Sequence, residues 1–217
     1  MKVFSNTAIS LDGRINTREG RFTTLGSKED HAHMSRLRAR ADAVLVGGST
    51  FRNWPHAALP EAADLGADPD QVRWNVVVSR GLALPFTPAY LAEPRIRPLV
   101  LTGTGAVPSG FPAEVEVEVW EGPGDAPVDW MLEALRRRGV ERLLVEAGGD
   151  LLFQFLAADA IDEMHVTLCP LVIGGNAPSL VDGPGFPLDA MRRLRLLESD
   201  VVGDEIFLRY GARRDVA

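Results

Sequence analysis

Short apolar runs alternate with amphipathic segments along the first two-thirds of the chain, and this pattern predicts strands that alternate with helices. Residues 2–9, 43–46 and 142–146 are compact apolar runs, as expected for strands buried on both faces of a parallel sheet. Further strands are predicted at residues 72–79, 98–102, 115–119, 163–173, 195–199 and 205–210. Because the last two follow one another without a helix, we expect them to form an antiparallel hairpin.

The predicted helices lie between these strands. The first runs from Ser27 to about residue 41, with Ser27 as N-cap and Asp30 in the capping-box position three residues later. The others are a short helix capped by Ser49, an amphipathic helix at 128–138 and a helix at 150–158. The pattern predicts one α/β domain over residues 1–217, with three layers, a mostly parallel central sheet and an antiparallel C-terminal edge hairpin. Residues 55–71 carry no clear period and are interpreted as a loop insertion.

Composition and charge exclude several classes of protein. The formal net charge of −7 argues against a nucleic-acid partner, although a small phosphorylated ligand in a local basic pocket is compatible with it. The single cysteine, Cys169, excludes a disulfide framework. No apolar run approaches the roughly 20 residues that cross a bilayer, so we expect no membrane association. Because the N-terminus lacks the features of a secretory signal, a cytoplasmic protein is expected.

Two glycine pairs stand directly before predicted helices. Gly47-Gly48 and Gly148-Gly149 each follow an apolar strand, where ligands of parallel α/β sheets bind. Glycine permits close approach of a ligand, and a helix N-terminus offers free N–H groups to phosphate, so two such turns suit a dinucleotide. They are equally compatible with tight turns that bind nothing. The carboxylate of Asp150 would repel a phosphate, so we expect a ribose or a neutral part of a cofactor beside it.

The histidines and the cysteine do not form a metal site. His31 and His33 point to different faces of their helix and are interpreted as surface residues. His165 and Cys169 share one face of a strand, but two ligands do not make a zinc site, and core packing is the better interpretation. No phosphate-binding loop or nucleophile elbow is present.

Several short segments, in this order and spacing, resemble the pyrimidine reductases of riboflavin biosynthesis, which have a dihydrofolate-reductase-like fold. They are Ser10-Leu-Asp-Gly-Arg-Ile15, Leu37-Arg-Ala39, Asp42-Ala-Val-Leu-Val-Gly47 with Thr50, Val76-Val-Val-Ser-Arg80 and Leu144-Val-Glu-Ala-Gly-Gly149. The resemblance implies an NADPH-dependent reductase that transfers a hydride to the ribosyl C1′ of an aminopyrimidine ribosyl phosphate. It also implies a homodimer, for which residues 163–173 are a candidate interface.

The resemblance also implies roles for individual residues. The cofactor would contact Ala8, Gly47, Thr50, Ser79, Arg80, Gly148, Gly149, Asp150 and Leu151. Asp12 and Glu146 are the implied catalytic residues, with Asp12 on the floor of the site and Glu146 facing the pyrimidine. Arg38 would hold the substrate phosphate, and Arg80 would pair with the 2′-phosphate of NADPH. Both arginines are also compatible with ordinary solvated positions.

The segment after Thr50 departs from the family pattern. The family has an aspartate there, followed by a proline, a leucine and an arginine that binds phosphate. In this chain the aspartate position falls on Asn53 or Trp54, and no arginine follows Leu59 until Arg73. Arg21 or Arg52 is a candidate replacement. Two alternatives therefore stay open, a reductase of another substrate such as a pterin and a non-catalytic NADPH-binding relative.

Overall fold

The fold is described from a computed structural model that covers residues 1–20, 24–61, 68, 70–103, 105 and 107–213. Its strands are β1 (Lys2–Ser10), β2 (Ala43–Gly47), β3 (Arg73–Ser79), β4 (Ile96–Thr102), β5 (Glu116–Val119), β6 (Arg142–Glu146), β7 (Glu163–Cys169), β8 (Leu194–Val202) and β9 (Glu205–Ala212). Its α-helices are α1 (Lys28–Ala39), α2 (Gly48–Asn53), α3 (Pro88–Leu91), α4 (Val128–Arg136) and α5 (Gly149–Ala157).

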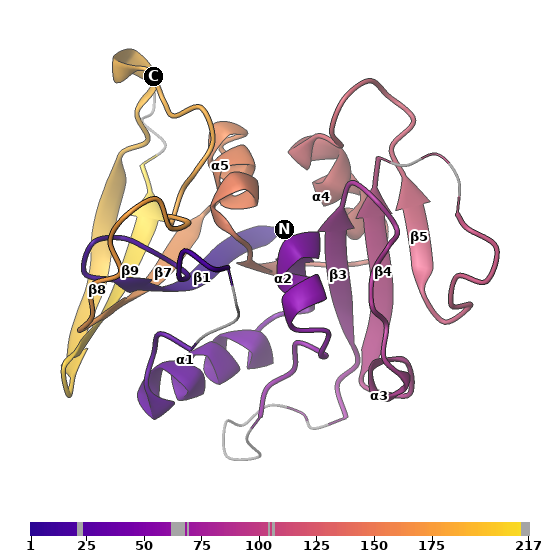
Figure 1. Cartoon of the computed structure of the whole chain (residues 1–217), viewed down its shortest axis with the longest axis horizontal. Coiled ribbons are helices and arrows are strands. Elements are labelled where there is room, and N and C mark those ends of the chain that lie inside the picture. The colour runs from indigo at the N-terminus through magenta and orange to yellow at the C-terminus, as the bar shows by residue number, and fades with distance from the viewer. Residues whose placement is uncertain (21–23, 62–67, 69, 104, 106, 214–217) are drawn as a thin grey trace.

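The described strands form a single sheet with the order β5-β4-β3-β2-β6-β1-β7-β9-β8 (Figure 1). Every neighbouring pair from β5 to β7 is parallel, whereas β9 pairs with both β7 and β8 in antiparallel fashion. The predicted parallel sheet and its antiparallel C-terminal edge hairpin are therefore confirmed.

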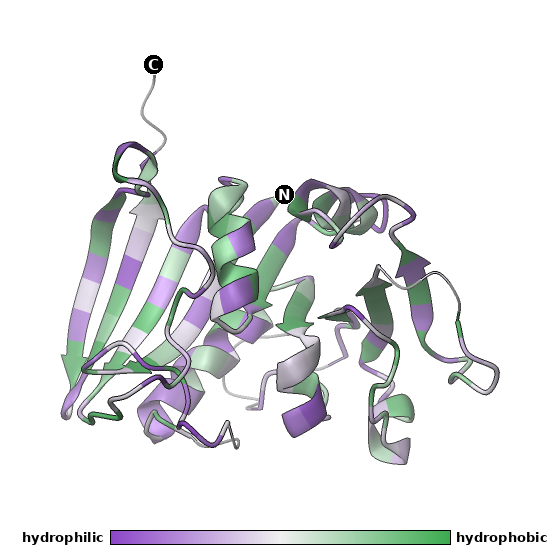
Figure 2. Cartoon of the chain, turned by 45° about the horizontal axis from the view of Figure 1, so that its top comes forward, coloured by the Kyte–Doolittle hydropathy of each residue, from purple (hydrophilic) through white to green (hydrophobic). Residues whose placement is uncertain are grey.

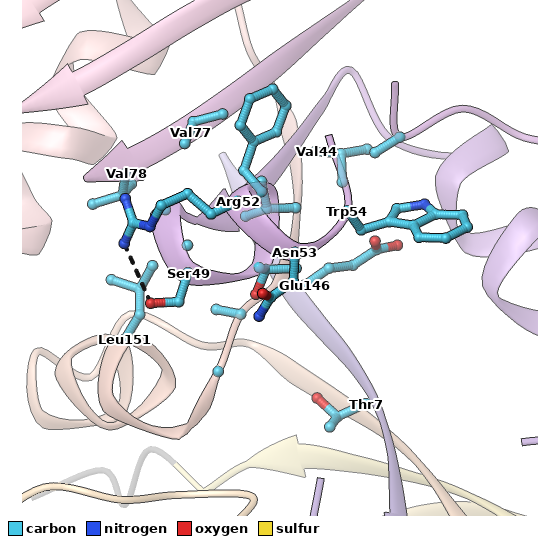
Figure 3. Close-up of a pocket in the computed structure, with 18 of the residues that line it drawn as sticks. Thr7, Val44, Ser49, Arg52, Asn53, Trp54, Val77, Val78, Glu146 and Leu151 are labelled. Atoms are coloured by element: carbon cyan, nitrogen blue, oxygen red, sulfur yellow. Dashed lines mark hydrogen bonds between the residues drawn. The ribbon is translucent and has the colours of Figure 1, made fainter. Parts of the chain in front are cut away.

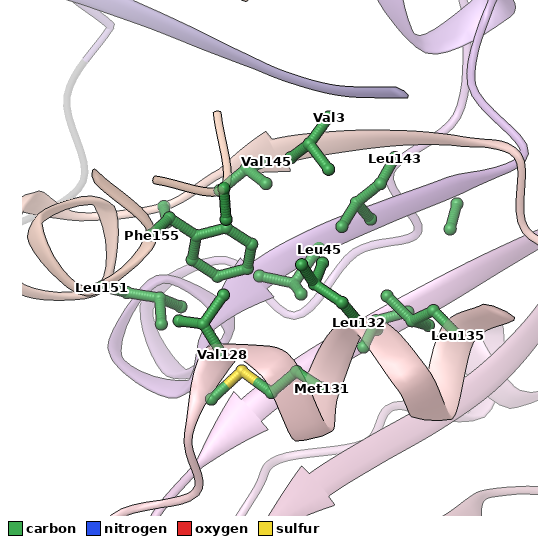
Figure 4. Packing of buried hydrophobic residues seen from close by; sticks show 14 of the residues in the cluster. Val3, Leu45, Val128, Met131, Leu132, Leu135, Leu143, Val145, Leu151 and Phe155 are labelled. Carbon is green, nitrogen blue, oxygen red and sulfur yellow. The ribbon is translucent and has the colours of Figure 1, made fainter. Parts of the chain in front are cut away.

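Helices cover both faces of the sheet and make three layers (Figure 1). On one face α4 and α5 bury the main core, in which Leu132 and Phe155 pack with Leu45 from the central strand β2 (Figure 4). On the other face α1 packs through Leu37, and α2 and α3 pack through Phe51 and Tyr90. Because the central strands are buried on both sides, they read as continuous apolar runs in the sequence.

Hydropathy changes from the centre of the sheet to its C-terminal hairpin. The strands β8 and β9 mix hydrophilic and hydrophobic residues (Figure 2). Apolar side chains of β8, Leu196, Val201 and Val202, are exposed. The strand β7, which contains most of the candidate dimer interface at residues 163–173, lies between β1 and β9 and has no free edge, so its role in a dimer stays a prediction. The exposed edge of this half of the sheet belongs to β8.

Several boundaries differ from the predictions. The strand β7 ends at Cys169 rather than residue 173, because Pro170 lacks the N–H group that would continue the ladder. The short helix α3 was not predicted. The predicted loop at 55–71 contains no helix or strand in its described part, and residues 62–67 and 69 lie outside the described residues. None of the described helices has the length and apolar character needed to cross a membrane.

The histidines of α1 and β7 form part of the packing between these elements. His165 and Cys169 are buried, which confirms their interpretation as core residues. His33 is half-buried rather than a free surface residue, since its ring centroid lies 5.5 Å from that of His165 and 5.4 Å from that of Phe207. Burial lowers the pKa of His165 to about 4, so this ring is neutral at physiological pH.

Candidate active site

A cleft opens where β2 and β6, two neighbouring strands, send their following helices to opposite faces of the sheet. The register places Val46, near the end of β2, beside Glu146 at the end of β6. Ligands of open α/β sheets bind at such a switch point. The cleft has a volume of about 890 Å³ and is lined from β1, α1, α2, β3 and the β6–α5 turn (Figure 3).

The predicted cofactor residues lie along this cleft. They are Ala8, Gly47, Thr50, Ser79, Arg80, Gly148, Gly149, Asp150 and Leu151. The predicted substrate residues Arg38 and Glu146 line it as well. The structure thus brings together side chains from five separate stretches of the sequence, while their roles toward a ligand stay predictions.

The two glycines of each pair have different surroundings. A Cβ atom on Gly48 would lie 2.5 Å from Ser79 Oγ, and one on Gly149 would lie 2.5 Å from the carbonyl oxygen of Ser179, so packing within the protein requires these two glycines. A Cβ on Gly47 would meet nothing closer than 3.9 Å, and one on Gly148 would meet nothing within 4 Å. The first glycine of each turn therefore borders open space.

The N-terminus of α5 is not capped by a side chain, because its N-cap residue is Gly148. Asp150 lies in the first turn of α5 but is exposed and makes no capping hydrogen bond there. The helix α2 likewise has Gly47 at its N-cap, so the predicted cap by Ser49 is wrong. Backbone N–H groups at both turns are free of side-chain caps, and this arrangement fits the phosphates of a dinucleotide.

Arg38 and Glu146 form a buried ion pair at the floor of the cleft. Arg38 Nε donates to Glu146 Oε1 at 2.8 Å, and Nη2 donates to Oε2 at 2.6 Å. The side chains are only 15% and 12% exposed. Burial alone would lower the pKa of Arg38, but the charge and hydrogen bonds of Glu146 outweigh it and raise the pKa. The two residues act as a unit, which their separate predicted roles did not anticipate.

Arg52 lies next to Ser79, one of the predicted cofactor contacts. Its Nη1 is 3.4 Å from Ser79 Oγ and its Nη2 is 3.5 Å from Ser49 Oγ (Figure 3). Arg52 makes no ion pair within the described part of the chain. Arg80 is engaged by Asp125, with Nε and Nη2 each donating to a carboxylate oxygen at 2.9 Å. The role of Arg52 as a replacement for the missing substrate arginine stays a prediction.

Asp12 is not among the residues that line the cleft, and its predicted catalytic role stays a prediction. Its carboxylate accepts hydrogen bonds from Ser10 Oγ at 2.7 Å and from the backbone N–H groups of Ile173 and Gly174 at 3.0 and 2.7 Å. The hydrogen bond from Ser10, followed by that from Ile173, lowers the pKa of Asp12 to about 2. Asp12 therefore connects the turn after β1 to the loop after β7 through hydrogen bonds.

The segment that departs from the family pattern also lines the cleft. Asn53 donates from Nδ2 to the carbonyl oxygen of Gly20 at 3.3 Å, and the rings of Trp54 and His56 lie 4.5 Å apart. Arg21, the other candidate replacement for the missing arginine, lies outside the described residues. Among the residues described, no group of three or more metal-binding side chains is present.

Two polar residues that line the cleft were not predicted as site residues from the sequence. Asn6 is buried in β1 and lines the cleft, and its place within an apolar strand was the signal that could have identified it. Asp30 of α1 also lines the cleft, although its spacing from Ser27 predicted a capping role.

Comparison with known proteins identifies the family. Residues 1–208 match the family model described as the RibD C-terminal domain. A protein of Archaeoglobus fulgidus named 2,5-diamino-6-ribosylamino-4(3H)-pyrimidinone 5′-phosphate reductase is 32% identical over 93% of this chain and 94% of its own length. A protein of the same name from Methanothermobacter thermautotrophicus is 30% identical and covers 96% of both chains.

Solved structures confirm the fold. Acinetobacter baumannii RibD matches 98% of this chain with a TM-score of 0.80 and 22% identity, and this chain spans 58% of its length. A pyrimidine reductase-like protein from Corynebacterium diphtheriae matches 99% of this chain and 92% of its own, with a TM-score of 0.78 and 24% identity. With the family model matching nearly the whole sequence, the chain belongs to the RibD C-terminal domain family of pyrimidine reductases.

Proposed function

We propose that this chain is an NADPH-dependent reductase of the aminopyrimidine ribosyl phosphate stage of riboflavin biosynthesis. The diamino compound in the names of the relatives, 2,5-diamino-6-ribosylamino-4(3H)-pyrimidinone 5′-phosphate, is the first candidate substrate. Its deaminated counterpart is the second. The observation that carries the proposal is the cleft between the two glycine turns, with Arg38–Glu146 at its floor and Arg52 at one end.

Different residues of the cleft bind the cofactor and the substrate. A reduced nicotinamide supplies a hydride when NADPH is bound. The turns at Gly47 and Gly148 offer backbone N–H groups to the pyrophosphate. Arg38 holds Glu146 in one orientation, and a carboxylate has enough acceptor sites to bind a pyrimidine N–H group in addition. The enzyme thus acts chiefly by positioning the substrate carbon against the hydride donor.

The assay that tests this function mixes the purified protein with NADPH and either pyrimidine, and follows the loss of NADPH absorbance. We expect oxidation of NADPH with at least one of the two pyrimidines and formation of the ribityl product. Turnover of a pterin but of neither pyrimidine would favour the reductase of another substrate. Binding of NADPH without oxidation by any of these compounds would favour the non-catalytic relative.

The preference for NADPH over NADH should depend on Arg52. Removal of a charged donor that binds a phosphate costs about 1.5–3 kcal/mol, which corresponds to roughly a 10- to 150-fold weaker affinity. We expect Arg52→Ala to weaken NADPH binding by this factor and to leave NADH binding unchanged, as measured by calorimetry. Arg80→Ala should have the smaller effect, because Asp125 already engages its guanidinium.

An equal loss of affinity for both cofactors in Arg52→Ala would contradict this assignment. A larger loss of affinity for NADPH alone in Arg80→Ala than in Arg52→Ala would identify Arg80 as the residue that binds the 2′-phosphate. Arg52→Lys is the conservative variant, and it should recover part of the NADPH preference because a point charge remains.

The proposal includes a homodimer in the cytoplasm that acts on a phosphorylated small molecule and has neither nucleic acid nor membrane as a partner. The exposed apolar side chains of β8, with Val201 at 72% exposure, support an interface at this edge of the sheet. Sedimentation of the protein at several concentrations measures the oligomeric state.

A further inference from the structure

Asp30 does not perform the capping role that its spacing from Ser27 predicts. The backbone N–H of Ser27 donates instead to Glu205 Oε1 at 2.7 Å, and Ser27 Oγ lies 2.6 Å from Glu205 Oε2. Glu205 is the first residue of β9, far away in the sequence. Because Glu205 supplies the carboxylate that a capping box would take from Asp30, the side chain of Asp30 is available for another purpose.

The carboxyl group of Asp30 is buried at the wall of the cleft. The residue is 7% exposed and lines the cleft, and its Oδ1 has no hydrogen-bond partner among the described residues. A Cβ on Gly26 would lie 2.1 Å from Asp30 Oδ2, so the absence of a side chain at Gly26 makes room for the carboxyl. The hydroxyl of Thr167 lies beside it, and Thr167 is the β7 neighbour of Ala8, a predicted cofactor contact.

A buried carboxyl oxygen without a partner costs free energy, so it implies a ligand or a proton at that place. The other carboxylates that line the described part of the cleft are ion-paired, hydrogen-bonded or exposed: Glu61, Asp125, Glu146, Asp150 and Asp182. Within the described residues, Asp30 is thus the buried carboxyl of the cleft that still has an open oxygen.

We propose that Asp30 is the proton donor of the reduction, and that its carboxyl gives the proton to the ring oxygen O4′ of the ribosyl group. The inference rests on the proposed function. In the reaction the C1′–O4′ bond breaks, the hydride forms the new C1′–H bond, and O4′ takes one proton to become the 4′-hydroxyl. The hydride comes from the reduced nicotinamide and the proton from Asp30, which recovers one from solvent, so atoms and charge balance.

The groups that face Asp30 favour its neutral form. Burial is the largest influence and raises the pKa of Asp30, against a lowering by the Thr167 hydroxyl. The charges of Glu205 on β9 and Glu146 on β6 raise this pKa further, while His31 on α1 lowers it. Cys169 on β7 adds no charge, because burial raises the pKa of its thiol to about 12. Asp30 therefore keeps its proton to a higher pH than an ordinary aspartate does.

Asp30→Asn tests the proposal, because the amide keeps the shape of the carboxyl but cannot donate this proton. General acid catalysis contributes about 10²- to 10⁴-fold, so kcat should fall by at least about 100-fold, with KM for the pyrimidine within roughly threefold of the wild type. The wild-type kcat should decline as the pH rises through the pKa of Asp30, and this decline should be absent in the variant. Calorimetry of NADPH binding and the Tm show whether the variant is folded.

Glu205→Gln is the matched variant at a second buried carboxylate. It removes a negative charge that raises the pKa of Asp30, so the decline of kcat with rising pH should move to lower pH. Carbon-13 NMR of labelled aspartate carboxyls measures the same titration without substrate, and Asp30→Asn identifies the signal. A merely structural role for Asp30 would change the Tm and leave the pH profile in place.

Several results would overturn the inference. A raised KM with unchanged kcat in Asp30→Asn would make Asp30 a pyrimidine-binding residue. Loss of the decline of kcat with rising pH in His31→Gln, but not in Asp30→Asn, would identify His31 as the proton donor instead. If the Asp30 carboxyl titrates like an ordinary aspartate, the inference that it donates the proton loses its physical basis, even if the protein oxidises NADPH with a pyrimidine. A wild-type protein that oxidises NADPH with neither pyrimidine would refute the proposed function and this step together.

Discussion

Replacing Glu146 by glutamine should destabilise the protein by about 3–5 kcal/mol, since removal of one partner from a buried ion pair leaves an uncompensated charge. Arg38 stays charged in this variant, because a guanidinium does not lose its proton at neutral pH. Its remaining described hydrogen bond, from Nη1 to the carbonyl oxygen of Leu59 at 3.3 Å, cannot balance that charge. Urea denaturation at neutral pH measures the free energy of unfolding of the variant and the wild type.

Asp125→Asn is the control, since it breaks a second ion pair of the same bidentate geometry. Arg80 and Asp125 are 84% and 52% exposed, in contrast to the buried pair. Exposed pairs contribute at most about 1 kcal/mol, so this variant should unfold close to the wild type. Equal losses of stability in the two variants would mean that burial does not set the strength of the Arg38–Glu146 pair.

Gly149→Ala should lower stability by about 1–3 kcal/mol or more, because a methyl group has no room at the start of α5. Its Cβ would lie 2.5 Å from the carbonyl oxygen of Ser179 and 2.8 Å from the backbone nitrogen of Asp182. Both are main-chain atoms, so they cannot turn away as a flexible side chain can. We expect a lower Tm and a weaker affinity for NADPH, because the turn that holds the pyrophosphate would shift.

The neighbouring glycine offers a matched comparison. Gly148 has φ −70°, which alanine adopts freely, and a Cβ there would meet nothing within 4 Å. Gly148→Ala should therefore keep the Tm of the wild type but weaken NADPH binding by at least tenfold, since the methyl group would occupy the space in which the pyrophosphate approaches. Unchanged binding in a folded Gly148→Ala variant would exclude this turn as a phosphate site.

The sheet was predictable from the sequence because its strands are local features. The runs at β2 and β6 are continuous and apolar, as strands covered on both faces must be. The alternation of valine and glutamate in β5 is typical of a strand with one face in water, and β5 lies at an edge of the sheet. The end of β7 was misplaced because apolar residues continue past Pro170, which cannot donate to the ladder.

The sequence by itself determined the α/β fold class, the two glycine turns and, through its motifs, the family. Only the tertiary structure decided which side chains meet. The motifs suggested Asp12 as a site residue, but its carboxylate accepts a hydrogen bond from the loop after β7. The spacing from Ser27 predicted that Asp30 would accept a hydrogen bond from the Ser27 N–H group, but Glu205 accepts it instead. Arg38 and Glu146 lie 108 residues apart in the chain, yet they form one buried pair. The physical reason is that periodicity records which face of an element is buried, whereas hydrogen-bond partners depend on elements that folding brings together from distant parts of the chain.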